Sequence, residues 1–272
     1  MKKFLLITLA VVTGFISLAQ ERPRPRSQSK LDKKSEKRER LNTLMKQEEE
    51  EGEIIFRKHS IFGIKLATDG YGISYESGKY KSNRLTTILQ FELNEKKHPK
   101  EYKTSLNFDI FGNVNQIIVG KLNNFYQFKA GYGHQYRIGG KANKNGVSVT
   151  AIGAGGLSLG LLKPYYVDVE NDARQRLRKR YPEILDSGYG RIGAAGLTVG
   201  LSEMNLRPGA HAKAALRFDY GRFNEMVSAV EAGLNAEYYA SNIPQMARNK
   251  EKHFFFNAYI TVLFGRRRLN IN

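Results

Sequence analysis

The sequence predicts an all-β fold, an antiparallel transmembrane β-barrel of about eight strands, on three observations. The last apolar stretch, residues 254–264 (FFFNAYITVLF), alternates between apolar and mixed side chains, so one face of that strand is apolar. Residues 1–19 have the features of a secretory signal peptide. Similar alternating segments, rich in Gly, Tyr and Phe, recur from residue 59 onward. An exported chain made of such strands favours a barrel in a bacterial outer membrane.

The signal peptide has its three parts in order. Lys2 and Lys3 supply the positive start, residues 4–16 form an apolar run that is short for a membrane helix, and residues 17–19 (SLA) precede a cleavage site next to Gln20. A retained membrane anchor is the alternative interpretation. The sequence contains no cysteine, which excludes lipidation at a Cys, disulfides and thiolate metal or catalytic sites.

Residues 20–58 form a separate, charged segment. It opens with RPRPRSQS, where two prolines favour an extended backbone, and continues with helix-forming residues of both charge signs. Residues 21–53 hold four large apolar residues, too few to bury one face of a helix. We therefore expect a solvated, partly helical periplasmic segment, either a linker or a docking helix for a periplasmic partner. The predicted barrel then covers residues 59–272.

The formal net charge is +18, and much of it lies in residues 21–46 and in the triplet 266–268, which we expect to form a basic tail after the last strand. Such a charge is typical of proteins that bind nucleic acid, but export argues against that function. Lipid phosphates, lipopolysaccharide, peptidoglycan-layer components or an acidic protein are more consistent partners.

Eight alternating segments are candidate strands. The first changes phase at Asp69-Gly70, which indicates a bulge or a tight bend. Residues 104–120 are ambiguous between a loop and part of the third strand. The expected strands are residues 60–80, 85–95, 126–136, 147–162, 191–201, 211–220, 227–239 and 254–264.

This count fixes where the connections lie. With a periplasmic N-terminus, the turn at residues 221–224 is periplasmic and residues 241–252 form an exterior loop. The same count puts the long insert at residues 163–187 in the periplasm, where short turns are expected, so ten strands are an open alternative. A soluble β-sandwich or a lipocalin-like barrel is a second alternative fold. Its strands also alternate between apolar and polar residues, but their apolar face points inward.

Charged residues share the strand face opposite the apolar one. Side chains just fill the interior of an eight-stranded barrel, and buried charges must be paired. We therefore expect a neutralising interior network, with a conduction path as the alternative. Its candidate members are Lys65, Glu92, Lys129, Lys213, Arg217, Asp219, Glu231 and Glu237.

We expect no enzyme, no metal site and no cofactor. The histidines (His59, His98, His134, His211 and His253) are scattered without HExxH or paired spacing. His98 near Glu101, and His211 near Asp219, each place a base beside a carboxylate, but no spacing adds a nucleophile and an oxyanion donor. Residues 156–160 (GLSLG) match the GxSxG pattern of serine hydrolases, yet the alternation continues through them where that motif needs a sharp turn. Ser158 is therefore expected to be a packing residue.

The segment after the fourth predicted strand is the candidate contact surface. LKPYY is followed by DARQRLRKRYPE, which we expect to be helical and cationic. The tyrosines fit an interfacial aromatic belt or a docking surface, and the helix fits anionic headgroups or an acidic partner. The candidate partner or lipid contacts are Lys163, Pro164, Tyr165, Tyr166, Arg174, Arg176, Arg178 and Arg180.

Several motifs also carry a resemblance. KHPKE, GKLNNFYQFKAGYG, NGVSVTAIGAGGLSLGLLKPYY, PGAHAKAALRFDYG and NIPQM occur in this order within residues 61–264. Together they resemble an uncharacterised family of outer-membrane β-barrel proteins of Bacteroidota. The resemblance implies the location and the fold, and it brings no assigned catalytic residues.

These features predict a non-enzymatic outer-membrane barrel that serves as a structural or accessory component of an envelope complex for barrel insertion, secretion or surface export. A narrow channel or a small-ligand-binding barrel is the alternative. The expected partners are outer-membrane lipid and other envelope proteins, and nucleic acid is not among them. Phe264 is expected to be the terminal aromatic residue that insertion machinery recognises.

Overall fold

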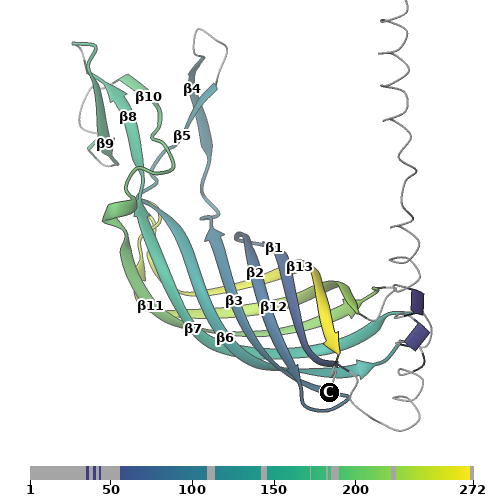
Figure 1. Ribbon diagram of the computed structural model, residues 1–272. Coiled ribbons are helices and arrows are strands. Elements are labelled where there is room, and N and C mark those ends of the chain that lie inside the picture. Colours follow the sequence, from purple (N-terminus) through teal and green to yellow (C-terminus); the bar gives the residue numbers. More distant parts are fainter. Residues whose placement is uncertain are drawn as a thin grey trace, which may run out of the picture. The chain divides into compact units, whose positions relative to one another are not determined.

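A computed structural model gives the fold of the chain (Figure 1). It describes residues 35–36, 39–40, 43, 56–108, 114–141, 146–171, 173–181, 183–184, 190–221 and 225–269. The chain divides into two units, Met1–Glu53 and Ile54–Asn272. The described residues of the first unit have helical backbone, and Arg40 pairs with Glu36 at 3.0 Å. The predicted signal peptide and most of the predicted charged segment lie outside the described residues.

The described part of the second unit contains strands and one short 3-10 helix. The elements are β1 (Phe56–Ala67), β2 (Gly70–Tyr80), β3 (Leu85–Lys96), β4 (Lys103–Phe108), β5 (Val114–Ile118), β6 (Asn123–Gly139), β7 (Ser148–Pro164), β8 (Tyr166–Glu170), β9 (Arg176–Arg180), β10 (Gly190–Ala194), η1 (Leu201–Glu203), β11 (Asn205–Asp219), β12 (Met226–Ile243) and β13 (Lys252–Leu269).

Eight of these strands close into a barrel in the order β1-β13-β12-β11-β7-β6-β3-β2. Neighbouring strands are antiparallel, and the barrel closes where β1 pairs with the second half of β13, from Ala67↔Tyr259 to Phe56↔Leu269. The predicted eight-stranded antiparallel barrel is therefore confirmed. The structure also resolves the alternative of ten strands in favour of eight.

Two of the predicted strands were assigned wrongly. One of them is two barrel strands and the other lies outside the barrel, so the total number of strands is still eight. The segment 60–80 is two strands, β1 and β2, joined by a turn at Thr68-Asp69. A side chain at Gly70 would meet the carbonyl oxygen of Glu95 at 1.9 Å, so this tight turn requires glycine. The segment 191–201 lies outside the barrel, because β10 pairs with β8 in a separate sheet.

The correct strand assignment divides the connections between the two ends of the barrel. One end of the barrel holds Phe56, Leu269 and the connections at residues 81–84, 140–147 and 220–225, and we call it the terminal end. The opposite end, here the loop end, holds the turn at 68–69 and the connections at 97–122, 165–204 and 244–251. The insert at 163–187 thus lies opposite the termini, and its predicted place beside them was wrong.

The barrel is apolar outside and polar inside. On β1, Ile64 and Leu66 are 58% and 68% exposed, whereas Lys65 between them is 5% exposed. Outward tyrosines lie toward both ends, including Tyr71 and Tyr238 near the loop end and Tyr136 and Tyr220 near the terminal end. A soluble barrel has the reverse arrangement, so this is a transmembrane barrel with the apolar band and aromatic girdles of the outer-membrane type.

The chain continues as strand beyond the predicted end of the last segment. β13 runs to Leu269 because its arginines pair with the start of β1, as in His59↔Arg267. Phe264 points outward and is half exposed, while Arg267 enters the interior and bonds to Asp219. The expected basic tail at 266–268 is therefore part of the barrel wall. Among the described residues, no helix has the length and apolar character needed to cross a membrane.

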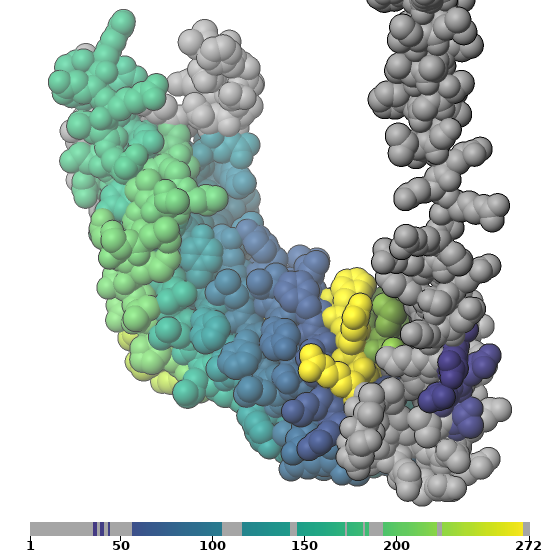
Figure 2. Space-filling model, viewed as in Figure 1, coloured from purple at the N-terminus to yellow at the C-terminus, as the bar shows by residue number. Residues whose placement is uncertain are grey.

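Five short strands form a platform at the loop end, namely β4, β5, β8, β9 and β10. The sheet β10-β8-β9 and the hairpin β4-β5 extend beyond the barrel wall (Figure 1), and β8 and β9 stand out in teal in the space-filling view (Figure 2). Their shared core consists of Ile117, Tyr165, Val167, Val169 and Ile184. Backbone hydrogen bonds join this platform to the connections of the barrel. The Tyr165 amide donates to the Leu122 carbonyl, and the Leu122 amide donates to the Gln245 carbonyl, both at 2.9 Å.

Candidate functional site

The centre of the barrel interior is occupied by Arg217 and two carboxylates. Its guanidinium donates to both oxygens of Glu76 at 2.8 and 2.7 Å, a bidentate geometry, and to Glu231 at 2.7 Å. Arg217 lies opposite Glu231 in the β11–β12 register, whereas Glu76 reaches it across the barrel from β2. His59 lies 2.9 Å from Glu76 on the other side. Strand pairing and barrel closure together therefore assemble this group.

A chain of ion pairs continues from this centre toward the loop end. Lys213 lies 3.2 Å from Glu231 and 3.7 Å from Glu92, and Lys65 donates to Glu92 at 2.7 Å. Lys129 lies 3.9 Å from Glu92 and also pairs with Glu237.

The chain ends at the mouth of the loop end. Lys96 lies 3.1 Å from Glu237 and 2.5 Å from Asp69. At the opposite, terminal end, Asp219 pairs with Arg267 and lies 3.2 Å from Lys141. Charged side chains therefore run along the inside of the barrel from one end to the other.

The interior network between the two ends is balanced in charge. It joins the cations Lys65, Lys96, Lys129, Lys213 and Arg217 to the carboxylates Asp69, Glu76, Glu92, Glu231 and Glu237. Neutral donors add to it, since Tyr259 donates to Glu231 at 2.8 Å and Gln127 to Glu237 at 2.6 Å. The desolvation of buried charge is costly, and this pairing offsets it.

The structure places all eight predicted interior residues inside the barrel, and nine-tenths or more of each is buried. Sequence reasoning missed Glu76, Lys96 and Asp69, which complete the network. It also missed Arg267, which pairs with Asp219 at the terminal end. Glu76 could have been found from the alternation of β2, because Tyr75 points outward. The inward positions of Asp69 and Arg267 could be found only from the pairing register at the strand ends.

Ser158 and His211 also meet inside the barrel. Ser158 Oγ lies 3.1 Å from His211 Nδ1, and the two residues are 4% and 8% exposed. The strand β7 continues straight through GLSLG, so the exposed turn that a serine nucleophile needs is missing at this position. Within the described ranges, no three His, Cys, Asp or Glu side chains are grouped closely enough to hold a metal ion.

The cationic segment of the insert is a strand, and the predicted helix was wrong. β9 pairs with β8 from Tyr166↔Arg180 to Glu170↔Arg176, and Leu177 packs on the platform core. The hairpin tip is fixed by Asn171, whose side-chain oxygen accepts from the backbone of Gln175 at 2.8 Å. This pairing and the buried Leu177 override the helix propensity of the charged residues.

The arginines of this hairpin divide into paired and solvent-facing groups. Arg178 lies 3.1 Å from Asp168, and Arg180 pairs with Glu203 and donates to the Tyr166 hydroxyl at 2.9 Å. Arg174 and Arg176 are exposed, and Arg174 has the left-handed backbone φ of 57° at the hairpin tip. The platform therefore presents a cationic strand edge to solvent.

Three other candidate contact residues are internal to the fold. Lys163 is 4% exposed and donates to the Leu197 carbonyl at 2.6 Å, and Pro164 is buried. Tyr165 is buried, and its hydroxyl accepts from the backbone of Ile118 at 3.1 Å, so it joins the two halves of the platform. Burial raises the pKa of the Tyr165 phenol. The expectation that these residues form a contact surface or aromatic belt was wrong, because the platform covers them.

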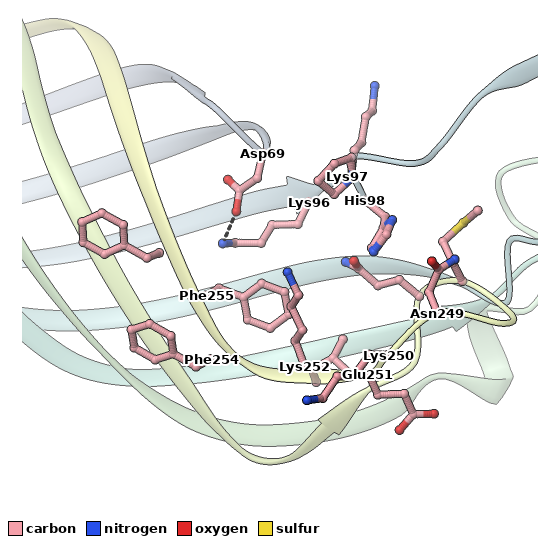
Figure 3. A pocket seen from close by; sticks show the side chains of 15 residues that line it. Asp69, Lys96, Lys97, His98, Asn249, Lys250, Glu251, Lys252, Phe254 and Phe255 are labelled. Carbon is pink, nitrogen blue, oxygen red and sulfur yellow. Dashed lines mark hydrogen bonds and ion pairs between the residues drawn. The ribbon is translucent and has the colours of Figure 1, made fainter.

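A pocket of about 150 Å³ opens at the loop end, between the end of β3 and the β12–β13 connection (Figure 3). Lys96 reaches Asp69 across its base, with the Phe255 ring 5.0 Å from the Lys96 ammonium. Burial lowers the pKa of His98, which lines the same pocket, from its ordinary value. The remaining lining residues are Lys97, Pro99, Ile243, Gln245, Met246, Asn249, Lys250, Glu251, Lys252, Phe254 and Phe256.

Comparison with known proteins gives structural matches of low sequence identity. No protein-family model and no curated protein matches the sequence. Among solved structures, the chain is similar to Ail, the attachment invasion locus protein of Yersinia pestis, crystallised with the heparin analogue sucrose octasulfate, at 11% identity and a TM-score of 0.37 over 78% of this chain and 98% of that one. Neisserial surface protein A matches at 9% identity and a TM-score of 0.39, over 78% and 97% of the two chains.

The N-terminal β-barrel domain of Pseudomonas aeruginosa OprF matches at 14% identity and a TM-score of 0.32, over 78% of this chain and 99% of that one. Likenesses at this level assign no function. The architecture of the barrel is established by its own strand pairing.

Proposed function

We propose that this protein is a non-enzymatic outer-membrane barrel that serves as a structural or accessory component of an envelope complex, with the platform as its docking surface. The complex would act in barrel insertion, secretion or surface export. The observation that carries the proposal is a platform with its own core, built on a barrel whose interior is filled by paired charges.

The filled interior supports a role through contacts rather than transport. Each carboxylate of the interior network is within 4.0 Å of at least one cation of the same network. Opening a path would require these pairs to separate and their charges to be solvated instead.

The form of the platform supports protein docking. Its buried core packs β8 and β9 against β5, β10 pairs with β8, and the outer edge of the sheet is the cationic strand β9. Arg174 and Arg176 project there without a salt bridge to any described residue. Arginine is enriched at protein interfaces, and an acidic face on the partner would complement this edge.

The lengths of the connections support an orientation. In outer-membrane barrels the short turns are periplasmic and the long loops extracellular. The two longest connections, residues 97–122 and 165–204, lie at the end opposite Phe56 and Leu269, so the terminal end would face the periplasm and the platform the exterior.

Crosslinking and affinity purification from intact membranes test this function. We expect the wild-type chain to recover at least one other envelope protein, and the charge reversal R174E/R176E to lose it. Reversal of two exposed lysines at the terminal end, K79E/K81E, is the matched control. Recovery of the barrel alone from crosslinked membranes, under several mild detergents, would contradict the proposal.

A small-ligand-binding barrel is the second candidate, and the pocket at the loop end favours it. If the barrel instead conducts, planar bilayers should give stepwise currents whose selectivity changes in K129Q or E231Q. Folded protein that leaves the bilayers silent would exclude conduction and leave ligand binding at the mouth.

A further inference from the structure

The pocket at the loop end is built from segments that hydrogen bonds tie together. The Lys97 backbone donates to the Asp69 carbonyl at 2.7 Å, and Lys100 Nζ donates to the Asn249 side chain at 2.9 Å. On the other side, the Ala247 backbone donates to the Gly120 carbonyl at 2.7 Å. The walls are therefore fixed relative to one another without a ligand.

Beneath the pocket the barrel is closed. Lys96 is buried and paired with both Asp69 and Glu237, and Phe255 packs on Phe125 and Tyr239 with ring centroids 5.6 and 6.0 Å apart. A molecule entering here meets a base of side chains rather than a continuous lumen. The pocket is thus a depression with a floor of packed side chains.

The two sides of the pocket differ in chemistry. Phe254 and Phe256 belong to the outward, lipid-facing row of β13 and are 54% and 62% exposed. The Lys97 ammonium lies 4.9 Å from the ring centroid of Tyr71, on the same outer surface. The site therefore spans the boundary between the apolar band and the charged rim.

Cations outnumber anions around this opening. Lys97, Lys250 and Lys252 are exposed and form no salt bridge within the described residues, and Glu251 is the exposed acid that faces the pocket with them. The other lining acid, Asp69, is already neutralised by Lys96. The surplus charge is positive and lies directly above the lipid-facing phenylalanines.

From this arrangement we propose that the pocket binds the phosphate of a phosphorylated lipid headgroup in the surrounding leaflet. Lys250 and Lys252 contact the phosphate, and Phe254 and Phe256 pack against the first carbons of the acyl chains. A soluble anion would use the lysines but leave the apolar wall in contact with lipid. This inference does not depend on docking at the platform.

Binding of lipid to the full chain in dodecyl maltoside micelles tests the proposal. The probe is diphosphoryl lipid A, titrated and followed by thermophoresis, with native mass spectrometry to count bound lipid. A lysine near a membrane surface contributes about 1 kcal/mol toward anionic lipid, so K250Q/K252Q should weaken binding about thirtyfold. The control K79Q/K81Q removes the same charge from the terminal end and should change binding less than about twofold.

A second variant and a competition experiment distinguish a site for phosphorylated lipid from a site for free phosphate. F254S/F256S should also weaken lipid A binding, and inorganic phosphate should compete poorly. Equal weakening by both lysine pairs, or no weakening by K250Q/K252Q in protein that still shows heat-modifiable migration, would overturn the assignment. Competition by inorganic phosphate as strong as that by lipid A, with no effect of F254S/F256S, would overturn the lipid part of it.

Discussion

Removing Arg217 is expected to destabilise the barrel by about 3–5 kcal/mol, the cost of breaking a buried ion pair by deleting one partner. Arg217 makes four hydrogen bonds to Glu76 and Glu231 at 2.7–3.1 Å. In R217M these carboxylates face each other, and the first keeps His59 and Gln135 as partners while the second keeps Lys213 and Tyr259. The large loss follows from uncompensated negative charge rather than from lost packing, because methionine has a similar length.

A compensating variant separates these two causes. R217M/E76Q removes one charge of each sign and leaves Glu231 with Lys213 and Tyr259, so it should recover about half of the loss or more. Urea unfolding in detergent, followed by far-UV circular dichroism, measures the free energies, and R84M at an exposed site should change them by less than about 0.5 kcal/mol. A loss below about 1 kcal/mol in R217M would refute the paired interior and indicate a hydrated lumen.

Three further predictions concern the wall, the platform and a close contact in the barrel. I64R places a charge on the lipid face and should cost about 2–4 kcal/mol of barrel stability in lipid bilayers, whereas on a solvent-facing wall it would be nearly neutral. Y165A removes a buried ring and the acceptor of the Ile118 backbone, so limited proteolysis should cut within the platform while barrel migration on a gel is unchanged; uncut platform would contradict its dependence on this core. G78A places a Cβ about 2.1 Å from the His59 ring and should lower refolding yield, which gel migration measures, and full yield would mean that the ring moves without cost.

The fold could be predicted well because alternation is strong on most strands. Along β12, Glu231, Asn235 and Glu237 point inward, as their spacing indicated, and Leu234 and Tyr238 point outward. Errors arose where alternation carries no information about pairing. The phase change at Asp69-Gly70 fits a bulge within one strand as well as the two-residue turn between β1 and β2, and the apolar pattern of 191–201 does not show that β10 pairs with β8.

The candidate site was predictable in its interior but not at its ends. Alternate residues of a strand point to the same face, so the inward positions of Lys65 and Glu92 could be predicted without knowledge of their ion-pair partners. The helix expected in DARQRLRKRYPE failed because sheet pairing and the burial of Leu177 are tertiary effects. The pocket at the loop end combines residues from three connections that only the barrel register brings together.

Labelling of single cysteines on intact cells tests whether the barrel spans the membrane with its platform outside the cell. The natural chain has no cysteine, so each introduced thiol is the sole reporter in this protein. With a membrane-impermeant maleimide, R174C at the platform tip should be labelled on intact cells and K81C at the terminal end only after permeabilisation of the outer membrane. Labelling of K81C but not R174C on intact cells would contradict the proposed orientation, and equal labelling of both would contradict a membrane-spanning barrel.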